Sequence, residues 1–215
     1  MPSAADNQAS DVYGSIMEEI AVRINSVDRL ITNPRWMRPV FVREYGYLQL
    51  RICCELVALA CLVCHNDIKG AQTKAITKSY EPRLILSQLE SLHADFFPVP
   101  VTLTKTETGW HLGDFEKPYL KKDEIIALWS KSGDFLHKGS LRKLYKSTDN
   151  YKSDANIDDV IDYMQRLINL VNAHRTTRIG RMVHFVTMIN STGWGEATTT
   201  IEVSVAIAEA QQPWS

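Results

Sequence analysis

Apolar side chains recur every three or four positions in five stretches of the chain, which is the period of an amphipathic helix. The predicted helices span residues 12–31, 40–66, 79–96, 121–137 and 155–174. The second of them is apolar nearly all round, and a helix of that composition is normally surrounded by others. In the last of them the spacing predicts an inward stripe of Ile157, Ile161, Met164, Ile168 and Val171. The pattern therefore predicts a bundle around a central apolar helix.

Two other segments follow the alternating period of a β-strand. In 99–112, apolar and polar residues alternate on both sides of Thr108-Gly109, which predicts a short β-hairpin. Residues 201–207 also alternate, and Met182–Ile189 is the predicted partner strand. The predicted fold class is mainly α: a bundle of about five helices with a small inserted β-hairpin and a C-terminal β-hairpin.

These elements divide the 215 residues into three parts. They are a flexible N-terminus at 1–11, the helical bundle with its inserted hairpin at 12–177, and a C-terminal β element and tail at 178–215. The first ten residues lack the basic start and apolar run of a signal peptide. The apolar run Ile52–Cys64 is short and interrupted by Glu55, so it predicts no membrane span. We expect a cytoplasmic protein that does not bind membranes.

Charge and cysteine content exclude several function classes. A formal net charge of −1 gives no overall field typical of nucleic-acid or membrane binding. The four cysteines all fall in one apolar stretch and are expected to be reduced, buried thiols: Cys53, Cys54, Cys61 and Cys64. Residues 61–65 spell CxxCH, the haem attachment pattern, but they continue a long apolar helix in a chain expected to be cytoplasmic. The cysteines and His65 do not share one helix face, so no zinc site and no cofactor are predicted.

Arg51 and Glu55 are the first candidate for chemistry. They lie four residues apart, so they are neighbours on the predicted helix 40–66. A charge on so apolar a helix is costly unless it is paired. One interpretation is a structural ion pair inside the bundle, and the other is a pair that faces a polar cleft and contacts a substrate.

His137 and the basic residues after it are the second candidate. His137 ends a predicted helix, and Lys138, Arg142 and Lys143 follow it with no acidic residue among them. An imidazole beside fixed positive charge can act on a phosphodiester, because the imidazole transfers the proton and the cations bind the phosphate. The alternative is a histidine that bonds to the end of its own helix, followed by a solvated loop.

The segments 47–55, YLQLRICCE, and 128–139, LWSKSGDFLHKG, together resemble a family of uncharacterised bacterial proteins. The second segment more distantly resembles the HEPN superfamily. That resemblance implies a helical bundle, usually dimeric, and in many members a metal-independent ribonuclease of toxin and phage-defence systems. The superfamily motif is an arginine, four to six residues and a histidine, often with a polar residue after the arginine.

Part of the motif carries over to this chain. His137 matches the motif histidine and Ser132 the polar neighbour, whereas Lys131 stands where the arginine is expected. Lysine supplies a point charge in place of a planar fork of donors. The resemblance therefore implies catalysis by His137 and Lys131, and Arg51, oriented by Glu55, would supply the missing guanidinium. Lys138, Arg142 and Lys143 would bind the RNA substrate.

Two other functions remain open from the sequence. The bundle could be a non-catalytic interaction or scaffold module, in which the C-terminal β element pairs with a protein partner or with a second copy. It could also sense a small ligand in a polar pocket around Arg51 and Glu55. A homodimer is expected under the first two hypotheses.

Overall fold

The computed structural model describes most of the chain. The described residues are 4–34, 37–107, 109–136, 157–177, 183–191 and 199–207. His137, Lys138, Arg142 and Lys143 lie outside these ranges.

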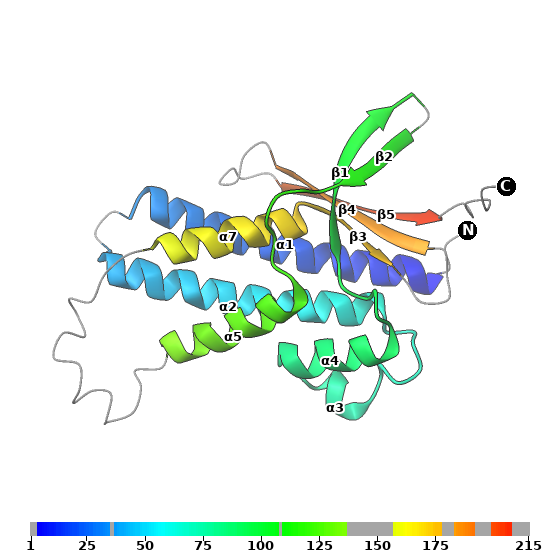
Figure 1. The fold of residues 1–215 in the computed structure, drawn as a ribbon, viewed down its shortest axis with the longest axis horizontal. Coiled ribbons are helices and arrows are strands. Elements are labelled where there is room, and N and C mark those ends of the chain that lie inside the picture. Colours follow the sequence, from blue (N-terminus) through cyan, green and yellow to red (C-terminus); the bar gives the residue numbers. More distant parts are fainter. Residues whose placement is uncertain are drawn as a thin grey trace.

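The described part of the chain is mainly helical, as expected (Figure 1). The helices are α1 Ala4–Thr32, α2 Pro39–Cys64, α3 Lys74–Thr77, α4 Pro82–Leu92, α5 Lys122–Leu136 and α7 Asp158–Val171. Helix α1 begins inside the predicted flexible N-terminus, and α3 lies where no helix was predicted. The other helices agree with the predicted ranges to within a few residues at most ends.

Both predicted hairpins are present, but they are parts of one sheet. The strands are β1 Val99–Thr106, β2 Gly109–Asp114, β3 Ala173–Thr177, β4 Val183–Ser191 and β5 Thr199–Ile207. Within the described residues they form an antiparallel sheet in the order β2-β1-β3-β4-β5. Strand β3, which begins where a helix was predicted, joins the two hairpins through the pairs Val99↔Arg175 and Pro100↔His174.

Helix α2 is the centre of the bundle. It packs against α1, α4, α5 and α7, and most of its length is buried. Its 26 residues are long and apolar enough to cross a membrane by length and composition, in contrast to the expectation from Ile52–Cys64 alone. However, 67% of the apolar window is buried inside the protein, as in the core helix of many folds. The cytoplasmic location and the absence of membrane binding stay predictions.

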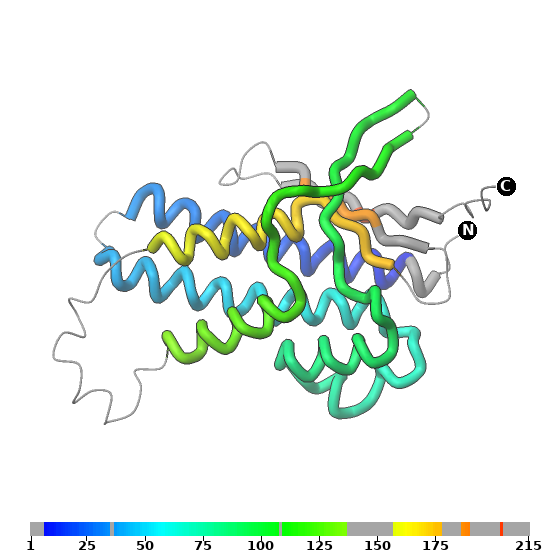
Figure 2. The backbone as a smooth tube through the Cα atoms, viewed as in Figure 1, coloured from blue at the N-terminus to red at the C-terminus, as the bar shows by residue number. Residues whose placement is uncertain are grey.

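The sheet lies against α1, while the end of the β1–β2 hairpin projects away from the helices (Figure 2). Val203 of β5 approaches α1 at Gly14, where an added Cβ would lie 3.6 Å from the valine Cγ2. A tighter contact joins α2 to α7, since a Cβ at Gly46 would lie 2.5 Å from Val160 Cγ1. Glycine at position 46 therefore sets the closest approach of these two helices.

The inward stripe predicted for the last helix is correct at Met164 and Val171, which are buried, and wrong at Ile161. Ile161 is 43% exposed, whereas Val160, Met164 and Leu167 are buried. Val160 fits over Gly46, so the shape of the α2 surface sets the rotation of α7 about its axis. The spacing of apolar residues in α7 alone does not reveal this shape.

Candidate functional site

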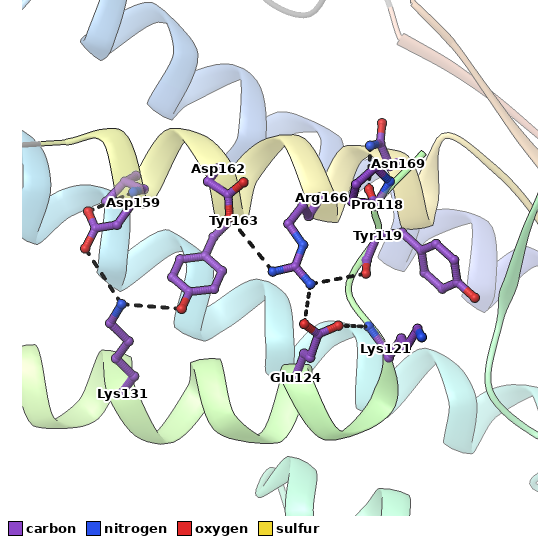
Figure 3. A network of polar contacts seen from close by, with 11 residues as sticks. Pro118, Tyr119, Lys121, Glu124, Lys131, Asp159, Asp162, Tyr163, Arg166 and Asn169 are labelled. Atoms are coloured by element: carbon purple, nitrogen blue, oxygen red, sulfur yellow. Dashed lines mark hydrogen bonds and ion pairs between the residues drawn. The ribbon is translucent and has the colours of Figure 1, made fainter. Parts of the chain in front are cut away.

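A cluster of charged and aromatic side chains lies where α2, α5 and α7 meet. It consists of Arg43 and Tyr47 of α2, Lys131 of α5, and Asp159 and Tyr163 of α7. Each pair from one helix is four residues apart and so shares a helix face. We call these five residues the Asp159 cluster. Figure 3 shows Lys131 reaching from α5 toward Asp159 and Tyr163.

Asp159 is the hub of the cluster. Its Oδ2 accepts hydrogen bonds from the Tyr47 hydroxyl at 2.5 Å and from Arg43 Nη2 at 2.6 Å, and it lies 3.8 Å from Lys131 Nζ. Partial burial would raise the pKa of Asp159, but the hydrogen bonds from Arg43 and Tyr47 outweigh burial and hold the pKa below its usual value. The carboxylate therefore stays charged and fixes both donors.

Lys131 keeps its charge in this setting. Its ammonium donates to the Tyr163 hydroxyl at 3.4 Å and lies 4.7 Å from the centre of the Tyr163 ring and 5.6 Å from that of Tyr47. Desolvation lowers the pKa of Lys131, but contact with the two tyrosine hydroxyls raises it above its usual value. The Lys131 side chain is 46% exposed. Two cations share one carboxylate within the cluster, so an accessible positive charge is left that can bind an anion.

Two stacked aromatic rings orient the Arg43 guanidinium. The rings of Phe135 and Tyr47 stack with centroids 4.4 Å apart, and the Arg43 guanidinium lies 4.8 Å from the Phe135 centroid. Stacking and the bond to Asp159 hold the guanidinium plane in place. Phe135 belongs to the last turn of α5, one turn after Lys131, so both side chains approach the α2–α7 contact from the same helix.

A row of contacts along α7 sets the position of α5 (Figure 3). Arg166 forms an ion pair with Glu124 at the start of α5 and donates to the Tyr119 carbonyl, while Asn169 donates to the Pro118 carbonyl. Glu124 also accepts from the Lys121 amide at 3.0 Å. These bonds hold the start of α5 against the later turns of α7. The last turns of α5, which carry Lys131, therefore lie against the first turns of α7.

Arg51 and Glu55 lie in a second group of contacts, with Trp129 of α5. The Arg51 guanidinium lies 4.0 Å from the indole centre and donates to the Trp129 carbonyl at 3.0 Å. Glu55 Oε1 accepts from the indole Nε1 at 2.7 Å and lies 3.6 Å from Arg51 Nε. Both charged side chains are about a quarter exposed, at 24% and 22%. This Trp129 cluster joins α2 to α5, and it offers few groups to a substrate because each partner is already engaged.

The structure thus separates the predicted site residues into two places. Arg51 and Glu55 come together around Trp129, whereas Lys131 reaches α7. Residues two apart on a helix point roughly 200° apart, so the side chains of Trp129 and Lys131 leave α5 in different directions. Arg43, and not Arg51, shares a carboxylate with Lys131. His137, Lys138, Arg142 and Lys143 lie outside the described residues.

Four members of the Asp159 cluster were not predicted from the sequence: Arg43, Tyr47, Asp159 and Tyr163. A signal was available, because Arg43 and Tyr47, like Asp159 and Tyr163, lie four residues apart and so share one face of a helix. Which of them meet is decided by the packing of α2 against α7, which one sequence does not show.

The CxxCH segment lies in the core. All four cysteines are buried, as expected, and none of them is in a disulfide bond. His65 is fully buried, and its Nε2 lies 3.0 Å from the carbonyl oxygen of Phe96. Burial raises the pKa of the Cys61 thiol well above its usual value, so the thiol stays protonated and is a poor metal ligand. Among the described residues no group of His, Cys, Asp and Glu side chains has an arrangement that could hold a metal ion.

A second buried histidine closes the contact between α1 and β3. The Tyr13 hydroxyl donates to His174 Nε2 at 2.6 Å, and His174 Nδ1 donates to the Val171 carbonyl at 3.0 Å. Both ring nitrogens are therefore used by the neutral imidazole. Burial lowers the pKa of His174 to about 4, although the bond to the Val171 carbonyl opposes that shift.

A pocket of about 450 Å³ lies between the start of α1 and the end of α2. Its lining combines apolar and amide side chains, including Val12, Leu62, Asn66 and Gln72. Neither Arg51 nor Glu55 lines it, so this pocket is not the one that the ligand-sensing hypothesis requires.

No protein-family model, curated protein or solved structure matches the chain. The resemblance to the HEPN superfamily therefore stays a prediction from the two sequence segments.

Proposed function

We propose that this protein is an HEPN-like RNA-binding protein that cleaves RNA without a metal ion, at the end of the bundle where α2, α5 and α7 meet. The observation that supports the proposal is the charge of the Asp159 cluster. Lys131, which stands at the arginine position of the motif, is charged, nearly half exposed and held between two tyrosine rings. A phosphodiester is the anion that the motif would place there.

In this proposal His137 carries the proton. It takes the proton of the ribose 2′-hydroxyl as the oxygen attacks the phosphorus, or returns one to the leaving oxygen. Lys131 stabilises the charge on the phosphate. Arg43, bound to the same carboxylate as Lys131, is better located to supply a guanidinium than Arg51, which stacks on Trp129. Lys138, Arg142 and Lys143 bind phosphates along the RNA.

The proposed cellular role follows from the same resemblance. The protein would act in the cytoplasm, as a homodimer, in a toxin or phage-defence system.

The test is a cleavage assay on single-stranded RNA with and without EDTA. Wild-type cleavage should survive EDTA, and His137→Ala should abolish it. Lys131→Ala should reduce cleavage, while Lys131→Arg should keep or raise it because arginine restores the fork of donors. Lys117→Ala, a change at an exposed lysine before α5, is the control and should leave cleavage unchanged. Cleavage that persists in His137→Ala would place the chemistry elsewhere.

A second candidate function is a non-catalytic dimeric interaction module. Phe41 and Leu48, seven residues apart on one face of α2, are 42% and 40% exposed, an unusual exposure for large apolar side chains on a core helix. A second copy would cover this face. Light scattering should then give the mass of a dimer for the wild type and of a monomer for Leu48→Glu. If the wild type is a dimer that never cleaves RNA, this candidate replaces the first.

A further inference from the structure

A basic surface lies on the segment that contains α3 and the start of α4. Four cations are exposed there: Lys69, Lys74, Lys78 and Arg83. Between residues 68 and 84 Glu81 is the one acidic residue, although the whole chain has a net charge of −1. Positive charge is therefore concentrated on a short stretch of a nearly neutral protein.

These four cations are not used to hold the fold together. In the part of the chain that the structure describes, none of them forms an ion pair, whereas Lys122 nearby is paired with Glu90 of α4 at 2.5 Å. Lys74 and Lys78 are four residues apart about the single turn of α3, so they extend on the same side. A surface of unpaired cations attracts a polyanion, and its binding is expected to weaken with salt.

Tyr80 gives this surface an aromatic platform. It is 65% exposed, more than any other large apolar side chain of the described residues. The backbone on both sides is fixed: the Ser79 amide donates to the Ile76 carbonyl at 2.9 Å, and the Ser79 hydroxyl accepts from the Glu81 amide at 3.1 Å. Pro82, which is buried, then starts α4. The ring is presented on an ordered turn, so little backbone entropy is lost when a planar group stacks on it.

We propose that this surface, Lys69, Lys74, Lys78, Tyr80 and Arg83, binds single-stranded RNA. The cations contact successive phosphates and one base stacks on Tyr80, which is the combination that single-stranded nucleic-acid sites use. This inference rests on the proposed function, because it adds a second RNA contact on elements that do not contribute to the Asp159 cluster.

The same chemistry could attract an anionic membrane, but the segment lacks the means to insert. Helix α3 has four residues and its one large apolar side chain, Ile76, is buried. A membrane-surface helix needs a continuous apolar face opposite its cations. Tyr80 and the 52% exposed Leu84 are separate positions and do not make such a face.

The experiment measures RNA binding apart from cleavage. Fluorescence anisotropy of a labelled single-stranded RNA is recorded with His137→Ala protein, in which the RNA stays intact. Adding Tyr80→Ala should weaken binding by about 5- to 100-fold, the loss of one stacked base. Adding Lys74→Glu and Lys78→Glu should weaken binding further and flatten its dependence on salt concentration. Circular dichroism checks that each variant is folded.

Two matched changes on the β1–β2 hairpin are the controls. Trp110→Ala removes a 52% exposed aromatic ring, and Lys105→Glu reverses an exposed lysine. Both should bind RNA within about twofold of the His137→Ala parent, a difference of under about 0.4 kcal/mol.

The outcomes separate this inference from the proposed function. Binding that depends on Tyr80 in a wild-type protein that never cleaves supports the surface and overturns the cleavage. Cleavage together with RNA binding that Tyr80→Ala and Lys78→Glu leave unchanged overturns the surface alone. A parent that binds no RNA overturns the surface, and if it sediments with phosphatidylserine vesicles in a Tyr80-dependent way, the partner is a membrane.

Discussion

Glu55 should stabilise the protein mainly through the indole of Trp129, and this can be measured. Glu55→Ala removes the acceptor of the 2.7 Å bond from Trp129 Nε1 and the partner of Arg51 at 3.6 Å. A hydrogen bond to a charged group contributes about 1.5–3 kcal/mol, and a partly exposed ion pair up to about 1 kcal/mol. Water can reach the partly exposed site, so we expect a loss near the lower end, about 2 kcal/mol of unfolding free energy.

The assay is urea unfolding followed by circular dichroism, for a double-mutant cycle of Glu55→Ala and Trp129→Phe. Phenylalanine keeps a ring beside Arg51 and removes the Nε1 donor. In the Trp129→Phe background, Glu55→Ala should cost about 1–2 kcal/mol less than in the wild type. Glu55→Gln, which keeps an acceptor, should cost under about 1 kcal/mol. Glu18→Ala, at an exposed position of α1, controls for the change in helix propensity.

Additivity would refute this reasoning. If the two changes add to within about 0.5 kcal/mol, the indole bond contributes nothing and the pair at 51 and 55 is a solvated surface pair. The interpretation that Arg51 and Glu55 contact a substrate would then be favoured over a structural role.

Four further predictions follow from the packing of two glycines and from the buried residues His174 and His65. Gly46→Ala should destabilise the protein by about 1–3 kcal/mol, because its Cβ would meet a valine of α7, whereas Gly14→Ala, with room for a methyl group in α1, should stabilise it by up to about 1 kcal/mol in the same urea assay. Because the folded pKa of His174 is about 4 and the unfolded one about 6.5, unfolding takes up a proton between these values. Stability should therefore be full above pH of about 6.5 and fall by about 3 kcal/mol toward pH 4, a slope that His174→Asn should lack. Protein with the buried Cys61–His65 segment should show no Soret band in its absorption spectrum.

The sequence predicted most helices and both hairpins, because each depends on local periodicity. The period-3.6 stripe in α1 and the alternation in β5 are visible within ten residues of chain. Strand β3 was missed because Ala173–Thr177 has no apolar alternation, and its pairing with Val99 joins residues far apart in the sequence. The polar start of α1 was missed because residues 4–11 carry no apolar stripe. They extend a helix that is stabilised by residues further along the chain.

The candidate site was predictable only in part. Arg51 and Glu55 were found as a pair because four-residue spacing makes them neighbours on any helix. Trp129, which binds both, comes from another helix. The meeting of Lys131 with Asp159 likewise depends on the rotation of α7, which is set by the fit of Val160 over Gly46. A one-residue error in that rotation moves every side chain of α7 by roughly 100°.

The packing of α1 against β5 has a consequence for synthesis. Helix α1 is synthesised well before β5, yet Val203 of β5 covers α1 at Gly14. The sheet-facing side of α1 therefore stays uncovered until β5 has been translated. Nascent chains stalled before β5 should expose this surface to chaperones and proteases, and chains that include β5 should not.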